Sequence, residues 1–293
     1  MYINLHSSHS LTAPPLLSLM AERSNICNAL HMPAQSGSST VLHRMRRGYT
    51  REAYLELINN VRDFIPSSDV AISSDFITGF CGESEDEHNE TLTLMDEVQF
   101  DQAFMFAYSV REKTHAHRTM EDDVPADVKQ RRLNEVIDCF RRNVQIRNTN
   151  VEIGKLRLVL VEGEAKKSTV DNRMLSGRTD QNKRVVFPSH GSCCFMEEEV
   201  HPYLSNVLSS PNPSGMLLEH LLGNIDNSSL QTMVELKRGD YAVVQITEVR
   251  GHTLKGRALW RSSIRGYDNF MNMKGWEDTF ASGLLLPESK IPA

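Results

Sequence analysis

The stretch LHMPAQSGSS, residues 30–39, indicates the fold class of this chain. It ends an apolar run, breaks at Pro33 and continues as a loop of small polar residues into a helix. A strand followed by such a loop and a helix is half of a βαβ unit, in which ligands bind at the carboxyl end of the strand. Gly37 lets the backbone approach a ligand, and Gln35 and Ser36 offer hydrogen bonds. An ordinary turn with a serine cap explains the same pattern.

Two further units of this kind follow along the chain. Strands are predicted over residues 70–77 and 103–109, and each runs into a polar loop. Asp75 lies at the end of the first, and Tyr108 and Arg111 lie at the end of the second. Consecutive strand–loop–helix units with polar groups just past each strand predict parallel βα repeats from a barrel. For Asp75, a helix cap or a structural hydrogen bond remains an alternative.

The pattern changes after a long helix that opens at Pro125. From residue 151 apolar and polar side chains alternate, with Gly-containing turns between short segments. This pattern predicts a small antiparallel β-barrel. Its expected strands include residues 156–161, 184–187, 241–247 and 254–259.

Three segments stand apart from these two domains. Residues 1–14 are expected to be a flexible leader, residues 188–234 an acidic insertion without Lys or Arg, and residues 263–293 a tail. Its residues His190, Cys193, Cys194 and His201 could bind zinc in principle, but their spacing fits no standard zinc site. No metal site is therefore predicted. The two domains are predicted at residues 15–150 and 151–262.

Composition limits the class of protein. With 40% hydrophobic residues the chain can form a core, and its net charge of -6 argues against a globally basic nucleic-acid binder. Five cysteines, an odd number, favour a reducing compartment over a disulfide framework. No apolar run is long enough for a membrane span, and the N-terminus lacks the features of a signal or transit peptide.

The motifs resemble one family specifically. LHMPAQSGSSTVLHRMRRGYTREAY (30–54), SSDFITGFCGESEDE (73–87) and FAYSVREKT (106–114) are similar to segments of the MiaB-like radical-SAM tRNA methylthiotransferases, with Cys81 and Lys113 as departures. The similarity is greatest to the eukaryotic mitochondrial branch named for a cyclin-dependent kinase regulatory subunit. KRGDYAVVQITEVRGHTLKGRAL (237–259) resembles a TRAM domain, an RNA-binding barrel.

The resemblance implies an α/β fold: the C-terminal half of a radical-SAM partial TIM barrel followed by a small all-β TRAM barrel. It implies S-adenosylmethionine and a 4Fe-4S cluster as cofactors. The expected cofactor-binding residues are Gln35, Ser36, Gly37, Arg47, Asp75, Tyr108 and Arg111. The expected RNA-binding residues are Lys183, Arg184, Lys237, Arg238, Arg250, Lys255 and Arg257. Solvated helix faces and strand edges are the alternative for these cations.

By resemblance the reaction is methylthiolation of isopentenyl-adenosine next to the anticodon of a tRNA. The cluster of the family needs three cysteines spaced C-x3-C-x2-C, which Cys27, Cys81, Cys139, Cys193 and Cys194 do not supply. No catalytic residue is therefore assigned, and the chain is expected to be a fragment or isoform that is inactive alone. The alternative is a non-catalytic module that binds RNA or a protein.

The resemblance also implies partners and a location. The expected partner is tRNA, together with a kinase regulatory subunit, and neither a membrane nor DNA is expected. The family implies the mitochondrion, while the missing transit peptide leaves a cytosolic location open.

Overall fold

A computed structural model describes residues 3–4, 14–65, 70–189, 195–196 and 235–272. The chain divides into two compact units, Met1–Asn150 and Val151–Ala293. Most of the leader, the insertion and the tail expected from the sequence lies outside the described residues, although residues 263–272 of the tail are described. Among the helices of the described residues, none combines the length and the apolar character that crossing a membrane requires.

The first unit contains a four-stranded sheet in the order β1-β2-β3-β4, with every neighbouring pair parallel. Its strands are β1 (Ile3–Asn4), β2 (Ala29–His31), β3 (Ala71–Thr78) and β4 (Gln102–Ala107). The parallel βα arrangement expected from the sequence is thus present. Strand β1 was not expected, because a strand of two residues is too short to show a periodic pattern.

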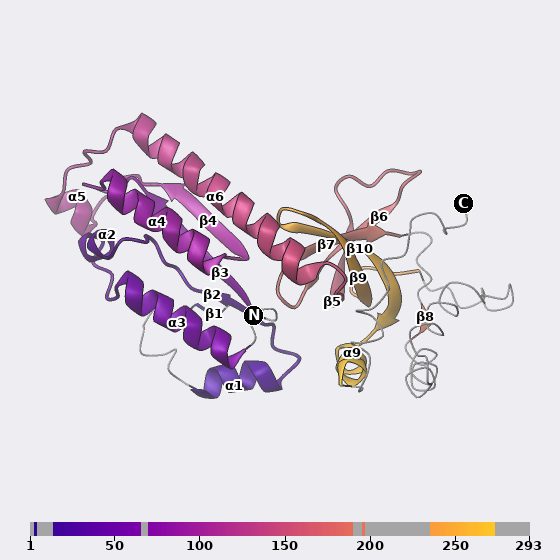
Figure 1. The fold of residues 1–293 in the computed structure, drawn as a ribbon. Coiled ribbons are helices and arrows are strands. Elements are labelled where there is room, and N and C mark those ends of the chain that lie inside the picture. Colours follow the sequence, from indigo (N-terminus) through magenta and orange to yellow (C-terminus); the bar gives the residue numbers. More distant parts are fainter. Residues whose placement is uncertain (1–2, 5–13, 66–69, 190–194, 197–234, 273–293) are drawn as a thin grey trace, which may run out of the picture. The chain divides into compact units, whose positions relative to one another are not determined.

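Helices connect these strands and follow β4 (Figure 1). They are α1 (Pro14–Glu22), α2 (Ser39–Arg44), α3 (Arg51–Phe64), α4 (Glu85–Val98), α5 (His115–Thr119) and α6 (Ala126–Glu152). The side chain of Thr50 accepts a hydrogen bond from the backbone of Ala53 at the start of α3. Ser84 and Glu87 form the reciprocal capping box that the S-x-x-E pattern predicts at the start of α4.

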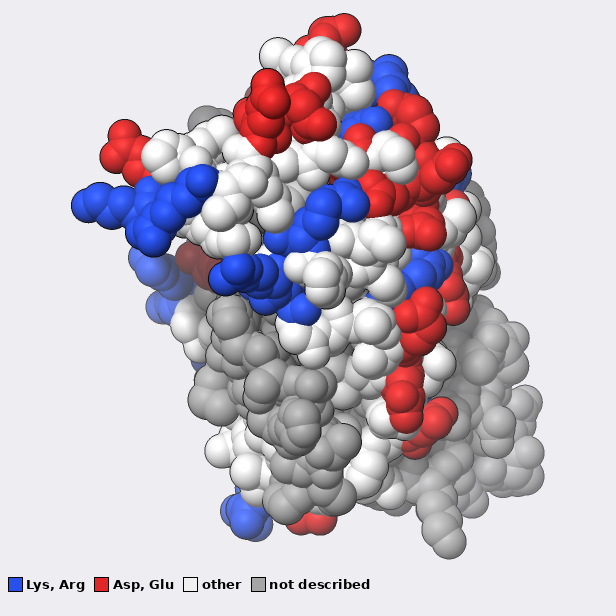
Figure 2. Space-filling view, turned by 90° about the vertical axis from the view of Figure 1, so that its left-hand side faces the viewer, with Lys and Arg blue, Asp and Glu red and all other residues white. Residues whose placement is uncertain are grey.

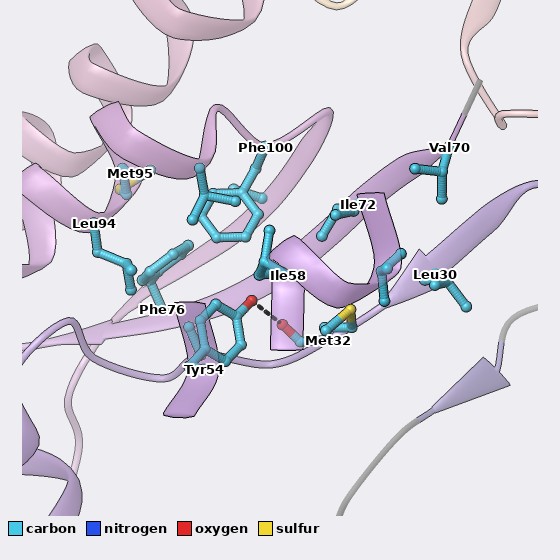
Figure 3. Close-up of a cluster of buried hydrophobic side chains, with 14 of the residues drawn as sticks. Leu30, Met32, Tyr54, Ile58, Val70, Ile72, Phe76, Leu94, Met95 and Phe100 are labelled. Atoms are coloured by element: carbon cyan, nitrogen blue, oxygen red, sulfur yellow. Dashed lines mark hydrogen bonds between the residues drawn. The ribbon is translucent and has the colours of Figure 1, made fainter. Parts of the chain in front are cut away.

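One face of the parallel sheet packs against α3 and α4 (Figure 3). Leu30 and Met32 from the β2 segment and Ile72 and Phe76 from β3 are all at most 2% exposed. The hydroxyl of Tyr54 on α3 donates a 2.7 Å hydrogen bond to the carbonyl of Met32. These side chains lie an even number of positions apart on their strands and so share one face, whereas His31, Ser73 and Asp75 must point to the other face.

The second unit contains a closed ring of five strands. They are β5 (Leu156–Glu164), β6 (Met174–Thr179), β7 (Arg184–Pro188), β9 (Tyr241–Arg250) and β10 (Thr253–Ser262). Neighbouring strands are antiparallel in the order β7-β6-β5-β9-β10, and a parallel pairing of β7 with β10 closes the ring. The small barrel expected from the alternating pattern is therefore present. The two-residue strand β8 (Phe195–Met196) pairs with the end of β10.

The barrel depends on close backbone contact. A Cβ atom at Gly177 would lie 2.3 Å from the carbonyl oxygen of Leu160, and one at Gly256 would lie 2.5 Å from that of Gln245. Where strands approach this closely, only glycine fits, because a side chain would collide with the neighbouring backbone.

Helix α9 (Ile264–Met271) follows β10, and the Phe270 ring meets the Trp260 ring edge-on at a centroid distance of 5.1 Å.

Candidate functional site

The loop after β2 continues the sheet beyond the strand itself. The backbone N–H of Gln35 donates to the carbonyl of Asp75 at 2.8 Å, and Ile77 N–H donates to the carbonyl of Gln35 at 2.9 Å. Gln35 has a φ of 66°, a left-handed conformation that non-glycine residues rarely adopt. Its side-chain oxygen accepts a 2.9 Å hydrogen bond from Arg47. Two of the residues expected at the cofactor site are thus joined at the carboxyl end of β2.

Ser36 and Gly37 serve a different contact from the one the sequence suggested. Ser36 is 1% exposed, with its hydroxyl 3.3 Å from that of Thr91 on α4, and the Gly37 N–H donates to Thr91 at 2.9 Å. A Cβ atom at Gly37 would lie 2.3 Å from the carbonyl oxygen of Glu90. The close backbone approach that Gly37 permits is therefore to α4, and a contact of Ser36 or Gly37 with the cofactor stays a prediction.

Asp75 lies on the sheet face opposite α3 and α4. Its carboxylate Oδ2 is 3.3 Å from Nε2 of His31, and Nδ1 of the same ring is 3.0 Å from the hydroxyl of Ser73. The side chain of Asp75 is 30% exposed and that of His31 is 15% exposed. His31 was not among the residues expected at the site. Its place between two buried apolar residues of a strand, with Ser73 and Asp75 two residues apart on the next strand, is the signal that could have found it.

Aromatic rings from β4 lie on this same face. Phe104 pairs with Asp75 in the parallel register, and Phe106 pairs with Ile77. The Phe104 ring meets the His31 ring edge-on at a centroid distance of 6.0 Å. Phe104 and Phe106 are 41% and 55% exposed. We call His31, Ser73, Asp75, Phe104 and Phe106 the open face.

Tyr108 belongs to a second group at the carboxyl end of the sheet. Its ring packs edge-on against Phe80 at 4.8 Å, and the Lys129 ammonium lies 5.4 Å from its centroid. Burial, followed by the neighbouring Cys81, raises the pKa of Tyr108 to about 12. Cys81 is 5% exposed in an apolar cluster with Phe80, which agrees with a packing role. The Tyr108 ring thus packs within this group, and its place at the cofactor site stays a prediction.

Arg111 follows Tyr108 in an exposed loop, and its carbonyl accepts hydrogen bonds from Thr114. Within the described ranges, no hydrogen bond connects Arg111 to Gln35 or Arg47.

Figure 2 looks onto the side at which α2 and α5 lie in Figure 1. Lysine and arginine side chains lie there in separate groups, with acidic side chains at the top and along one edge.

The loop between β3 and α4 is held by a buried ion pair. Glu83 accepts a 2.6 Å hydrogen bond from Gly79 N–H and pairs with Arg132 of α6 at 3.0 Å. The two side chains are 1% and 4% exposed. Burial raises the pKa of Glu83, and the hydrogen bond from Gly79 and the charge of Arg132 oppose that rise. The hydrogen bond from Gly79 and the ion pair with Arg132 thus fix the conformation of this loop.

On the barrel, the expected RNA-binding residues divide into two groups. Lys183 is 7% exposed and its ammonium lies 2.8 Å from Glu152, which Arg157 also contacts at 2.8 Å. Burial opposes the charge of Glu152, but Arg157 and Lys183 together lower its pKa. Lys183 is thus part of an internal charge cluster that the sequence did not predict, because the partner carboxylate at the end of α6 is distant in sequence. Its contact with RNA stays a prediction.

The other six cations are at least partly exposed. Lys237 and Arg238 lie in the exposed turn before β9. Lys255 contacts Glu248 at 2.8 Å, and Arg250 also contacts Glu248. Arg184 and Arg257 are half-buried on β7 and β10. Because these two strands pair, their outward side chains share one surface.

The residues that the structure describes do not fit an iron–sulfur cluster. Within the described ranges, no group of three His, Cys, Asp or Glu side chains could hold a metal ion. The cysteines of this part of the chain, Cys27, Cys81 and Cys139, are separate free thiols. Cys193 and Cys194, with the two histidines weighed for zinc, lie outside it. Burial, followed by Asp96, raises the pKa of Cys139 to about 12, as expected for a thiol packed in the core.

The family model and the similar proteins indicate the same family. Residues 1–95 match the model of the Radical SAM superfamily. The chain is 44% identical over 266 residues to mouse "Mitochondrial tRNA methylthiotransferase CDK5RAP1", covering 90% of this chain and 39% of the mouse protein. It is 59% identical over 174 residues to the rice "CDK5RAP1-like protein", covering 59% of this chain and 28% of that one.

A bacterial relative extends the set. The "tRNA-2-methylthio-N(6)-dimethylallyladenosine synthase" of Chlorobium phaeobacteroides is 47% identical over 176 residues, which is 60% of this chain and 38% of that protein. Among solved structures, Escherichia coli coproporphyrinogen III oxidase (HemN) matches 57% of this chain and 33% of its own with 18% identity. Its TM-score of 0.34 is too low to support an argument.

The chain spans about two fifths of the length of the mouse relative. The similarity nevertheless covers nearly all of this sequence, including both compact units. The resemblance carried by the motifs is confirmed: this chain is a relative of the radical-SAM tRNA methylthiotransferases.

Proposed function

We propose that this chain supplies the substrate-holding part of a radical-SAM tRNA methylthiotransferase, an enzyme that adds a methylthio group to isopentenyl-adenosine beside the anticodon. The observation that carries the proposal is 44% identity over 90% of the chain to a tRNA methylthiotransferase. The parallel sheet would present the reacting base, and the barrel would hold the RNA backbone. The mitochondrion is proposed as the location on the same basis, and a kinase regulatory subunit as partner stays a prediction.

For S-adenosylmethionine, the paired Gln35 and Arg47 are the best candidates for the amino-acid end of the cofactor. An exposed guanidinium beside a fixed amide suits a carboxylate. Equilibrium dialysis with labelled cofactor tests this assignment. We expect Arg47→Gln to weaken binding about 10- to 150-fold, because a charged hydrogen bond contributes about 1.5–3 kcal/mol. Arg46→Gln, at the exposed neighbouring residue, is the matched control. Equal binding by both variants would contradict the assignment.

For RNA, we propose that the barrel is TRAM-like and contacts phosphates through Arg184, Lys237, Arg238, Arg250, Lys255 and Arg257. Filter binding of tRNA over a salt series tests this. Affinity should fall as salt rises, because phosphate neutralisation releases counterions. Replacing Lys237 and Arg238 with serine should reduce the magnitude of the log–log salt slope by about 1 for each phosphate that is no longer neutralised. Arg173→Ser, at an exposed barrel arginine paired with Glu164, should leave the slope unchanged. Absence of tRNA binding at low salt would refute the proposal.

The alternative function is a non-catalytic module that binds RNA or a protein. Cysteine spacing favours it for the polypeptide alone, since the described residues offer no cluster site. Reconstitution with iron and sulfide, followed by absorption spectroscopy, separates the two. We expect no stable cluster absorbance from this chain alone, and a stable cluster would overturn our interpretation of its cysteines.

A further inference from the structure

The loop between β5 and β6 carries a charge pattern that the proposed function does not use. Its residues 166–169 read Lys-Lys-Ser-Thr, and Val170 follows them. Thr169 is the one serine or threonine of the sequence with a lysine or arginine both two and three residues before it. Protein kinases choose among hydroxyl groups by such flanking charges, because carboxylates in the substrate groove bind the cations. A kinase can use this hydroxyl only where the fold leaves it accessible.

Thr169 lies in the exposed part of the loop. Lys166, Lys167 and Thr169 are exposed, and Val170, at 95%, has the largest exposed fraction among the large apolar side chains described. Within the described part of the chain, neither the Lys166 nor the Lys167 ammonium takes part in a hydrogen bond or an ion pair. Two cations and an apolar side chain next to the hydroxyl are thus free to enter the groove of another protein.

The turn at Thr169 can open without disturbing the barrel. The Thr169 N–H donates to the Asn172 carbonyl at 3.2 Å, and the Asn172 N–H donates to the Thr169 hydroxyl oxygen at 3.1 Å. Both bonds lie beyond the last ladder pair of β5 and β6, which joins Glu164 to Leu175. A kinase can therefore bind this segment in an extended form while the strands stay paired.

Other hydroxyl groups with a cation three residues before them are held by the fold. They belong to Thr50, Thr114, Ser176 and Thr253. Thr50 and Thr114 cap the N-termini of α3 and α5 with their hydroxyls. Ser176 in β6 and Thr253 in β10 each pair with a strand on either side. Both the charge pattern and the fold therefore favour Thr169.

We propose that Thr169 is a phosphorylation site for a serine/threonine protein kinase that selects basic substrates. The Thr169 oxygen attacks the γ-phosphorus of ATP, the new P–O bond forms as the bond to ADP breaks, and the hydroxyl proton passes to the catalytic carboxylate of the kinase. Residues 166–173 carry three cations and one carboxylate. A phosphate adds about −1.5 to −2 charges, so it cancels the positive charge of this loop.

Incubation of the full chain with ATP and the catalytic subunit of the cyclic-AMP-dependent protein kinase, a kinase of this class, tests the site. Intact mass spectrometry should show one added phosphate, and fragmentation should place it on Thr169. Thr169→Val should remove the phosphate and Thr169→Ser should keep it. Ser176→Ala should be modified like wild type. Circular dichroism melting of each variant checks that it folds.

The two lysines provide a measurement that leaves the acceptor unchanged. Lys166→Gln and Lys167→Gln should each lower the kcat/KM of the kinase for the chain about 10- to 150-fold, because each removes a charged hydrogen bond to the kinase. Lys155→Gln, at an exposed lysine just before β5, is the matched control and should be modified like wild type.

A synthetic peptide of residues 163–175 separates the charge pattern from its accessibility. The folded chain should be modified at most about 150-fold more slowly than the peptide, because only two hydrogen bonds must open. The proposal is overturned if the kinase modifies the peptide but not the chain, or if it modifies neither. It is also overturned if the phosphate lies on Thr50, Thr114 or Ser176 instead, or if the two lysine variants are modified as fast as Lys155→Gln.

Discussion

The two faces of the parallel sheet use the same strands for opposite purposes. On the side of α3 and α4, Leu30, Ile72 and Phe76 are at most 1% exposed and form one apolar core. On the other side, Asp75 and Phe104 carry a carboxylate and a ring that remain accessible. Because neighbouring residues on a strand point to opposite faces, stability and ligand contact are assigned to alternate positions of one segment.

Two phenylalanines on neighbouring strands test this division most directly. Phe76 is fully buried, with its ring edge-on to Phe100 at 5.3 Å, so Phe76→Ala should lower the free energy of unfolding by about 3–5 kcal/mol. Phe104→Ala should change it by about 0.5 kcal/mol or less, because Phe104 is already exposed. Urea denaturation followed by circular dichroism measures both. Similar losses for the two variants would show that the open face is part of the core.

The approach of the loop 33–39 to α4 provides the next test. Gly37→Ala places a methyl group against the backbone of Glu90 and Thr91, and overpacking of this kind costs about 1–3 kcal/mol. Gly48→Ala is the matched control, since a Cβ atom there meets nothing within 4 Å. The same urea titration compares them. An unchanged urea midpoint for Gly37→Ala would mean that the loop or α4 moves to accommodate the methyl group without loss of stability.

The sequence was sufficient for the helix-covered side of the sheet and insufficient for the open face. The strands around Ile72 and Met105 were predicted because they are short apolar runs between turn signals. His31 was missed because the run 26–32 resembles a continuous buried strand, so its two faces could not be separated. The position of Asp75 was predicted, but its partner was not, because that partner comes from another strand.

Charged residues show the same limit. Ser84 and Glu87 were predicted to cap α4, because the capping box is local in sequence. Lys183 was expected at the surface, and only the fold brings it to the buried carboxylate of Glu152. Gly37 was predicted to permit a close approach, but the sequence could not tell whether a ligand or a helix comes near. A contact between residues that are close in sequence can be predicted, whereas a contact between residues that only the fold brings together cannot.

The smallest expected effect concerns the charges on the helix-covered side. Glu87 of α4 pairs with Arg44 of α2 at 2.6 Å, and this hydrogen bond is the main reason that its pKa falls to about 2. A carboxyl whose pKa is lower in the folded state stabilises the fold above its unfolded pKa, near 4.5 here, and loses that contribution as the pH falls toward 2. Glu87→Gln should therefore show a shallower loss of urea midpoint between these two pH values than wild type.

Glu85, in the same turn, is the control that makes this comparison sharp. Hydrogen bonds from Arg132 and Arg131 lower its pKa to about 2 as well, but its side chain is 54% exposed, against 16% for Glu87. Added salt should therefore remove most of the acid dependence due to Glu85 and little of that due to Glu87, because exposed charges are screened more strongly than enclosed ones. If salt reduces the two contributions equally, the Arg44–Glu87 pair behaves as a surface pair and does not tie α2 to α4.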